Sequence, residues 1–405
     1  MKQSRVKNTV RYYLLIVLVL GFLFLSNDFG LTDVQKTAIV VAAGIDRQDD
    51  TFIITSQIDI PQSSNQGNAS QAVQIVSRGK TVGEAFEEIN AKTGWYPKLV
   101  FCDLIVFGES AKEEDVFESL DYFLRDEYLS DRCLLAVCQG TAKELLNTAA
   151  LVDSSSSAAI KKVLSSHAER VGTVLPNTLR EFSIGYFSES RSGNLPIVST
   201  QPQQEKIGNS DTAPTAQGNQ NGSSSGSGTA KETTQDKPVF SASETALFVN
   251  GKWVEKLNSE ETFTLATVLS KLRLASYSVQ NDEAACTLNI RRNSPSVKLK
   301  AGEKDMFSLQ VKVTCTAGLL DYSRSQPIEK IGDAGDVPKE FFTLASKKLK
   351  GEIEDVYEKC RAANCDLFGV RERLVKYGKR RFHNRQDAIF QNTRIQADVR
   401  FQNVR

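Results

Sequence analysis

Hydrophobic and polar positions along the chain separate an apolar N-terminal run from a long mixed remainder. Tyr12 to Leu25 is an unbroken apolar run, and the flank before it carries basic residues and no acidic one: Lys2, Arg5, Lys7 and Arg11. Positive charge before an apolar core keeps an N-terminus in the cytoplasm. Segment 1–31 is therefore predicted to be a membrane anchor that leaves the following residues outside the membrane. Because the run is shorter than the about 20 residues of a typical span, a cleaved signal peptide stays the alternative.

Three strands are predicted next. Thr37 to Ile60 contains two stretches rich in β-branched residues, joined by the polar residues 47–50. This pattern is typical of a β-hairpin. A polar loop then leads to a third predicted strand, Ala72 to Ser77.

Capping boxes mark the helix starts that follow, because a hydroxyl residue is followed three positions later by a glutamate. They predict helices after Thr81, Ser110 and Thr141. The second helix would turn one apolar stripe to the core: Val116, Leu120, Phe123 and Leu124. Other predicted elements are strands at 99–107 and 133–137 and a helix at 154–170. Alternating strands and helices from residue 72 predict a mixed sheet with helices packed against it.

A polar stretch rich in Ser, Gly and Gln, residues 199–237, interrupts the pattern. Such a composition cannot form a packed core, so disorder is predicted. A linker between domains is one interpretation. We favour an insertion within one domain, because residues 194–199 and 244–249 read as strands on either side of it.

The rest of the chain is predicted to form an α+β domain. Asn250 and Gly251 indicate a hairpin turn, and Asn258 with Glu261 forms a further capping box. Strands are predicted at 286–291, 297–300, 308–316 and 394–404, and helices at 338–363 and 366–377. The long helix would face the core with one side: Phe342, Leu349, Ile353, Val356 and Cys360.

Composition narrows the class of protein. The chain has 405 residues, 40% hydrophobic content and a net charge of +1, which suits a multi-domain globular protein and gives no reason to expect a nucleic-acid partner. The seven cysteines are odd in number, contain no Cys-x-x-Cys pair and sit mostly in apolar segments. Buried free thiols are the simplest interpretation.

No catalytic, cofactor or metal site is predicted. The sequence GSSSG at 222–226 matches a nucleophile elbow only formally, because it lies in the polar stretch without a strand or helix. Residues 79–81 match the Gly-Lys-Thr end of a phosphate-binding loop, but Gln74 stands at the position where that motif requires its first glycine. The two histidines, His167 and His383, have no companion residues that would suggest an active site.

Two features are candidate partner contacts. Residues 371–385 carry seven basic side chains against one acidic, so they are either a solvated helix face or a contact for an acidic partner or anionic lipid. The candidates from this segment are Lys376, Lys379, Arg380, Arg381 and Arg385. Trp253 is a candidate interface anchor, although alternation with Val254 also suits a core position.

Several stretches resemble one family, the Ger(x)C proteins, which are C subunits of spore germinant receptors. The resemblance rests on six segments that occur along the chain in the same order as in the family. They are AIVVAAGID (38–46), SRGKTVGEAF (77–86), LIVFGESAKEEDVFESLDYFLRD (104–126), CQGTAKELL (138–146), ALFVNGKWVEKLNSEET (246–262) and EFFTLASKKLKGEIEDVYEKCRAANCDLFGVRERL (340–374). Such proteins typically begin with a lipid-modified cysteine, whereas the first cysteine here is Cys102.

The resemblance implies a non-enzymatic, three-domain mixed α/β protein on the outer face of the spore inner membrane, acting with two polytopic receptor subunits. The expected domains are 32–150, 151–280 with the insertion, and 281–405, after the anchor at 1–31. The alternatives are an envelope-anchored module that binds a small-molecule germinant, and an envelope structural protein unrelated to germination.

Overall fold

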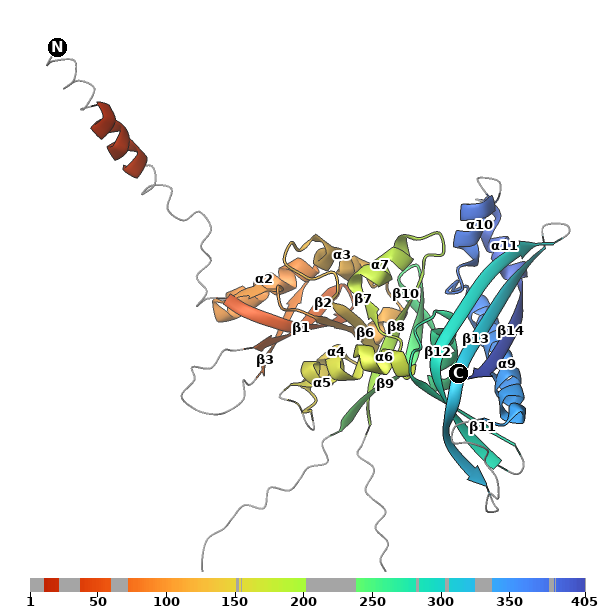
Figure 1. Cartoon of the computed structure of the whole chain (residues 1–405). Coiled ribbons are helices and arrows are strands. Elements are labelled where there is room, and N and C mark those ends of the chain that lie inside the picture. Colours follow the sequence, from red (N-terminus) through yellow and green to blue (C-terminus); the bar gives the residue numbers. More distant parts are fainter. Residues whose placement is uncertain are drawn as a thin grey trace, which may run out of the picture.

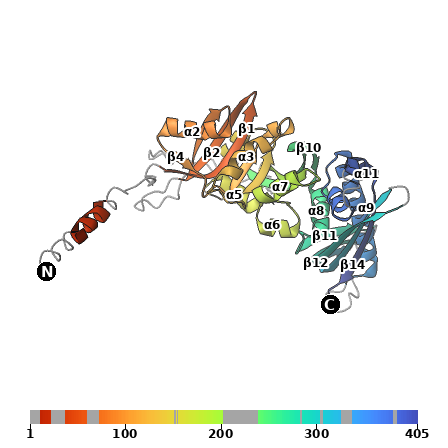
Figure 2. The same cartoon turned by 90° about the horizontal axis from the view of Figure 1, so that it is seen from above.

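The computed structural model describes two lobes, each built on a β-sheet, lying side by side (Figures 1 and 2). The described residues are 11–21, 37–59, 72–150, 153, 155–201, 238–281, 284–302, 306–324, 337–378, 382 and 384–404. We call strands β1–β10 with helices α2–α7 the N-lobe, and strands β11–β14 with helices α8–α11 the C-lobe. Residues 11–21 form a further helix, whose large apolar side chains from Tyr12 to Leu20 are exposed.

The predicted anchor is described only in part. Within the described ranges, no helix combines the length and the apolar character needed to cross a lipid bilayer. Residues 22–31 of the predicted anchor lie outside those ranges. The anchor stays a prediction.

Among the described residues, the N-lobe sheet has the strand order β10-β9-β8-β6-β5-β1-β2-β3, with β4 paired to β1 and β7 to β6. β1, β5, β6 and β8 run parallel in the middle, and antiparallel hairpins complete both sides, which confirms the predicted mixed sheet. The strands are β1 Thr37–Gln48, β2 Thr51–Asp59, β3 Ala72–Gly79, β4 Tyr96–Lys98, β5 Leu104–Phe107, β6 Leu134–Cys138, β7 Asn177–Thr178, β8 Ser192–Gln201, β9 Val239–Val249 and β10 Lys252–Leu257.

Helices cover both faces of this sheet (Figure 1). They are α2 Val82–Thr93, α3 Phe117–Arg125 and α7 Leu179–Phe187 on one face, and α4 Ala142–Asn147, α5 Ser156–Val163 and α6 Ser166–Val171 on the other. Along β5, Ile105 faces the first group while Leu104 and Val106 face the second. Because successive strand residues point to opposite faces, a strand covered on both sides must be apolar throughout.

The polar stretch joins two neighbouring strands of one sheet. β8 ends at Gln201, β9 begins at Val239, and these two residues pair in register. Residues 202–237 lie outside the described ranges. The connection between β8 and β9 is therefore an insertion within one sheet, as we favoured from the sequence. The division of the chain into three domains stays a prediction.

Three N-lobe predictions need correction. Ser110 caps no α-helix, because its hydroxyl accepts from the backbone N of Arg47 while residues 109–112 form a short 3-10 turn. α3 begins only at Phe117, and Leu124 on it is 40% exposed. The predicted strand 99–107 divides into a turn and β5, and the predicted helix 154–170 divides into α5 and α6. The caps at Thr81 and Thr141 are confirmed.

The C-lobe has the strand order β11-β12-β13-β14. Its strands are β11 Ala275–Gln280, β12 Ala284–Ala301, β13 Phe307–Arg324 and β14 Arg394–Asn403, and its helices are α8 Ser259–Val268, α9 Lys339–Ala362, α10 Val370–Gly378 and α11 Gln386–Asn392. The capping box at Asn258 and the hairpin turn at Asn250–Gly251 are confirmed.

β12 is one strand where the sequence predicted two, and β11 and α11 were not predicted. Pro295 lies inside β12 and pairs with Val313 of β13. β11 pairs with β12 only as far as Ile290, so the other edge of β12 is open at Pro295. A proline has no N–H to donate, and an open edge tolerates that loss.

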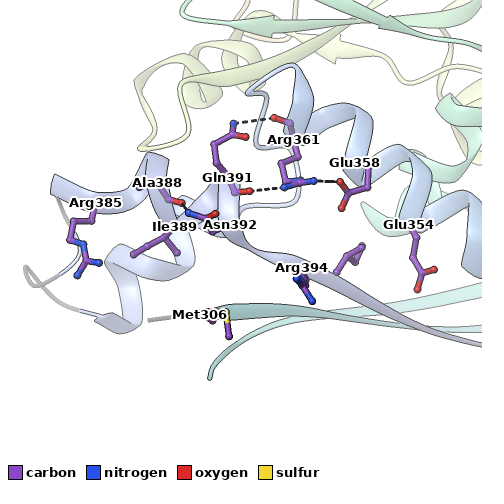
Figure 3. A pocket seen from close by; sticks show the side chains of 11 residues that line it. Met306, Glu354, Glu358, Arg361, Arg385, Ala388, Ile389, Gln391, Asn392 and Arg394 are labelled. Atoms are coloured by element: carbon purple, nitrogen blue, oxygen red, sulfur yellow. Dashed lines mark hydrogen bonds and ion pairs between the residues drawn. The ribbon is translucent and has the colours of Figure 1, made fainter. Parts of the chain in front are cut away.

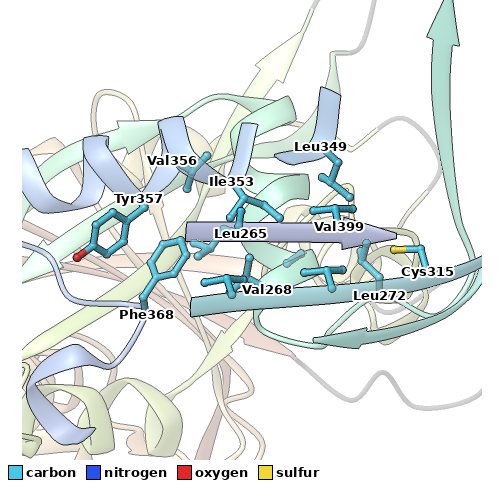
Figure 4. Close-up of a cluster of buried hydrophobic side chains, with 14 of the residues drawn as sticks. Leu265, Val268, Leu272, Cys315, Leu349, Ile353, Val356, Tyr357, Phe368 and Val399 are labelled. Atoms are coloured by element: carbon cyan, nitrogen blue, oxygen red, sulfur yellow. The ribbon is translucent and has the colours of Figure 1, made fainter. Parts of the chain in front are cut away.

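The long helix α9 holds the C-lobe core together (Figure 4). Leu349, Ile353 and Val356 are fully or almost fully buried against the sheet and against α8. Phe341 takes the buried position expected for Phe342, which is half-buried. The apolar stripe was otherwise predicted correctly, because the 3.6-residue period fixes which side faces the core.

A buried junction joins the lobes. In the loop before α10, the backbone N of Asp366 donates to Ser192 Oγ at the start of β8 (2.9 Å). The Asp366 carboxylate accepts from the backbone N of Val370 (2.9 Å) and of Arg371 (2.6 Å). Burial raises the pKa of Asp366, and these two hydrogen bonds oppose that shift. At a second point, Lys271 Nζ lies 2.9 Å from Glu169 of α6.

All seven cysteines are buried and carry free thiols, as predicted. Burial raises the pKa of Cys286 to about 11 and that of Cys315 and Cys365 to about 12. A thiol with a raised pKa stays protonated at neutral pH, and the thiolate is the reactive form.

We expect the folded protein to react with Ellman's reagent at pH 8 at essentially none of its thiols. In a denaturant, all seven should react within the mixing time, because unfolding restores both access and ordinary pKa values. Absorbance of the released thiolate gives the count. Rapid reaction of even one thiol in the folded protein would contradict this description of the core.

Candidate partner-binding groove

The basic segment 371–385 does not form one surface. Arg371 is 3% exposed: its Nε donates to Asp387 Oδ1 (2.8 Å), and its Nη2 donates to Asn364 Oδ1 (2.6 Å). The guanidinium also lies over the ring of Phe390, 4.3 Å from the centroid. Arg371 therefore ties α10, α11 and the end of α9 together and is not available to a partner.

Arg373 is also used inside the fold. Its Nη1 donates to the carbonyl oxygens of Phe368 (2.6 Å) and Gly369 (2.8 Å), just before α10. Lys376 is exposed on the same helix. Lys379, Arg380 and Arg381 lie outside the described residues, so their role as partner contacts stays a prediction.

Arg385 is exposed and borders a groove of about 770 Å³ (Figure 3). The walls are the second half of α9, the helix α11, the first residues of β14 and Met306 beside β13. We call this the C-lobe groove. Its lining residues are Met306, Glu354, Glu358, Arg361, Arg385, Ala388, Ile389, Gln391, Asn392, Arg394 and Ile395.

Charge in the groove is mixed, with three guanidinium groups and two carboxylates. Arg361 Nε donates to Glu358 Oε2 (3.0 Å), and Arg361 Nη1 donates to the carbonyl oxygen of Gln391 (2.6 Å). Within the described part of the chain, the Arg394 side chain forms no hydrogen bond or ion pair. An exposed guanidinium without a partner can bind a carboxylate with two parallel hydrogen bonds. The groove is therefore suited to an acidic side chain.

Trp253 is a core residue, which corrects its place among the candidate contacts. The residue is 6% exposed, and its Nε1 donates to the carbonyl oxygen of Glu255 (2.9 Å). The next residue on β10, Val254, is 45% exposed. Successive residues of a strand point to opposite faces, so Trp253 faces inward and Val254 faces outward.

Sequence reasoning missed Arg361 and Arg394, because the groove forms only when α9, α11 and β14 come together. No local pattern marks either residue.

Among the described residues, no group of three or more His, Cys, Asp and Glu is arranged to hold a metal ion.

Comparisons with known proteins fit this architecture. The family model for the spore germination protein N-terminal domain matches residues 31–200. The model described as spore germination B3/GerAC like, C-terminal, matches residues 243–405. The chain belongs to the Ger(x)C family. This is a family of germinant receptor C subunits, associated with spore membranes and not known as enzymes.

A solved structure also shares the fold. The crystal structure of the GerBC protein has a TM-score of 0.53 to this Ger(x)C chain with 16% sequence identity, covering 90% of this chain and 97% of that one. A search of curated proteins found no match.

Substitutions should distinguish Arg371, which stabilises the fold, from Arg394, which is exposed in the groove. Arg371→Ala removes the hydrogen bonds from this buried guanidinium to Asp387 and Asn364 and its contact with the ring of Phe390. We therefore expect it to lower the free energy of unfolding by about 2–4 kcal/mol. Arg394→Ala should change it by less than about 0.5 kcal/mol. Urea titration followed by circular dichroism measures both. Equal destabilisation by the two variants would refute the distinction.

Proposed function

We propose that this chain is a membrane-tethered, non-catalytic subunit of a nutrient germinant receptor, and that it acts by contacts with two polytopic subunits. Membership in the Ger(x)C family carries the proposal. In this account, the two-lobe body docks on its partners and stabilises or gates a receptor whose ligand site lies elsewhere.

The N-terminal helix supports the tether. From Tyr12 to Leu20, nine consecutive large apolar side chains are each between 46% and 69% exposed. So much contiguous apolar surface is unfavourable in water and suits lipid or a partner helix. The basic flank that ends at Arg11 would keep the N-terminus in the cytoplasm and leave both lobes on the outer face.

The C-lobe groove is the surface that we assign to a partner. Its exposed arginines, Arg385 and Arg394, fit acidic side chains on the parts of a polytopic subunit that project from the membrane. Lys379, Arg380 and Arg381 lie close to Arg385 in the sequence, and we keep them as proposed contacts for an acidic partner. Complementary charge of this kind favours the correct partner and speeds association.

Affinity purification tests this assignment. The chain, tagged at Arg405, should recover two polytopic proteins in fixed ratio from spore inner membranes in mild detergent. We expect Arg385→Glu with Arg394→Glu to lower that recovery at least about tenfold, because like charges then face each other.

The matched control reverses two charges elsewhere on the same lobe. Arg292 and Lys298 are exposed on β12, and Arg292→Glu with Lys298→Glu should leave recovery unchanged. Recovery of the wild-type chain alone, together with normal nutrient germination after deletion of its gene, would refute the receptor-subunit proposal. Equal loss in both double variants would refute the groove as the contact.

The size of the groove keeps one alternative open, a module that binds the germinant itself. About 770 Å³ lies within the range of small-molecule sites, and its paired charges suit a zwitterion. A germinant bound there at 100 times its Kd would stabilise the full chain by about 2.7 kcal/mol. Under our proposal, thermal unfolding in detergent should show no shift with germinant amino acids or sugars. A shift abolished by Arg394→Ala would favour the alternative.

A further inference from the structure

The turn between β4 and β5 carries apolar side chains at its tip. Val100 is 46% exposed and Phe101 is 61% exposed. The residues on either side, Leu99 and Cys102, are almost fully buried, and the backbone N of Cys102 donates to the carbonyl oxygen of Leu99 (2.9 Å). The buried base therefore fixes the turn and holds Val100 and Phe101 outward, where turns ordinarily carry polar residues.

Two tyrosines lie in the same part of the N-lobe. Tyr96, on β4, is 56% exposed, and Tyr128, in the loop after α3, is 59% exposed. Lys98 Nζ lies 5.2 Å from the centre of the Tyr128 ring, which joins that loop to β4. We call Tyr96, Lys98, Val100, Phe101 and Tyr128 the apolar end.

The apolar end lies where the chain enters the N-lobe. Thr37, the first residue of β1, pairs with Tyr96 of β4 in a parallel register. Fifteen residues separate Thr37 from Gly21 of the N-terminal helix, and such a segment spans at most about 50 Å when extended. A tether in the membrane would therefore hold this end of the molecule near the bilayer.

We propose that the apolar end rests on the lipid surface at the level of the headgroups. Tyrosine is enriched at membrane interfaces because its ring is apolar and its hydroxyl is polar. Val100 and Phe101 would enter the boundary of the acyl chains, and Lys98 would pair with anionic lipid phosphates. This inference rests on the tether in the proposed function.

The geometry favours lipid over a protein partner at this surface. The exposed groups are aromatic rings and one aliphatic side chain around a lysine, which is the composition of an interfacial anchor. A bilayer contact would also orient the molecule, since the C-lobe lies on the opposite side of the N-lobe from the start of β1 (Figures 1 and 2).

Depth-dependent fluorescence quenching tests this contact on the full chain. Glu127 is exposed beside Tyr128, so Glu127→Cys places an environment-sensitive NBD label there and keeps all five residues of the apolar end. The native thiols are buried and should not be labelled. The protein is reconstituted in phosphatidylcholine–phosphatidylglycerol vesicles that carry nitroxide lipids, without any partner subunit.

We expect the nitroxide lipids to lower the fluorescence of this label at least about twofold. The comparison label, at Gln280→Cys, lies on an exposed position of β11 in the C-lobe and should not be quenched. Val100→Ser with Phe101→Ser, made in the Glu127→Cys background, should remove most of the quenching.

The outcomes separate this inference from the proposed function. A chain that floats with vesicles while its Glu127→Cys label stays unquenched overturns the inference and leaves the tether intact. A chain that does not float with vesicles overturns the tether and this inference together. Quenching that arises only after the polytopic subunits are added makes the surface a protein contact and overturns the inference. Quenching that survives the serine substitutions means that Val100 and Phe101 do not hold this end at the bilayer, and it overturns the inference as well.

Discussion

The buried junction at Asp366 sets the relation between the two lobes, and with it the relation between the two surfaces that we assign to function. One carboxylate caps the start of α10 through two backbone N–H groups, while the same residue's N–H donates to the N-lobe at Ser192. A carboxylate taken from water is unfavourable unless such donors surround it. Here they hold α10 and β8 in one arrangement.

The C-lobe groove depends on the same region. Arg371 lies five residues after Asp366 and donates its backbone N–H to that carboxylate, while its side chain fastens α11 through Asp387 and Phe390. α11 then forms one wall of the groove, opposite Arg361 of α9. A single run of packed and hydrogen-bonded residues thus reaches from the N-lobe sheet to the groove.

Local signals in the sequence predicted elements whose geometry a few neighbouring residues decide. The turn at Asn250–Gly251, the caps at Thr81 and Asn258, and the apolar stripe of α9 are of this kind. β12 was divided wrongly, because whether Pro295 interrupts a strand depends on where β11 ends, and that is a tertiary fact.

The candidate site was harder to predict for the same reason. Arg371 and Arg385 look alike in a basic run, yet one is fixed in the interior and the other borders the groove. Burial of Arg371 depends on Asn364 and Phe390, which only the fold brings to it. The count of basic residues therefore could not tell a guanidinium fixed in the interior from one at the surface.

The pairing of Gln201 with Val239 has a consequence for how this protein can change over evolutionary time and in the laboratory. The chain leaves and re-enters the sheet at adjacent positions, whatever number of residues lies between. Doubling a connection costs only about 0.6 kcal/mol in closure entropy. Relatives can therefore differ widely in length here without altering the sheet, and a fluorescent domain inserted at this position would report on the assembled protein without displacing either lobe.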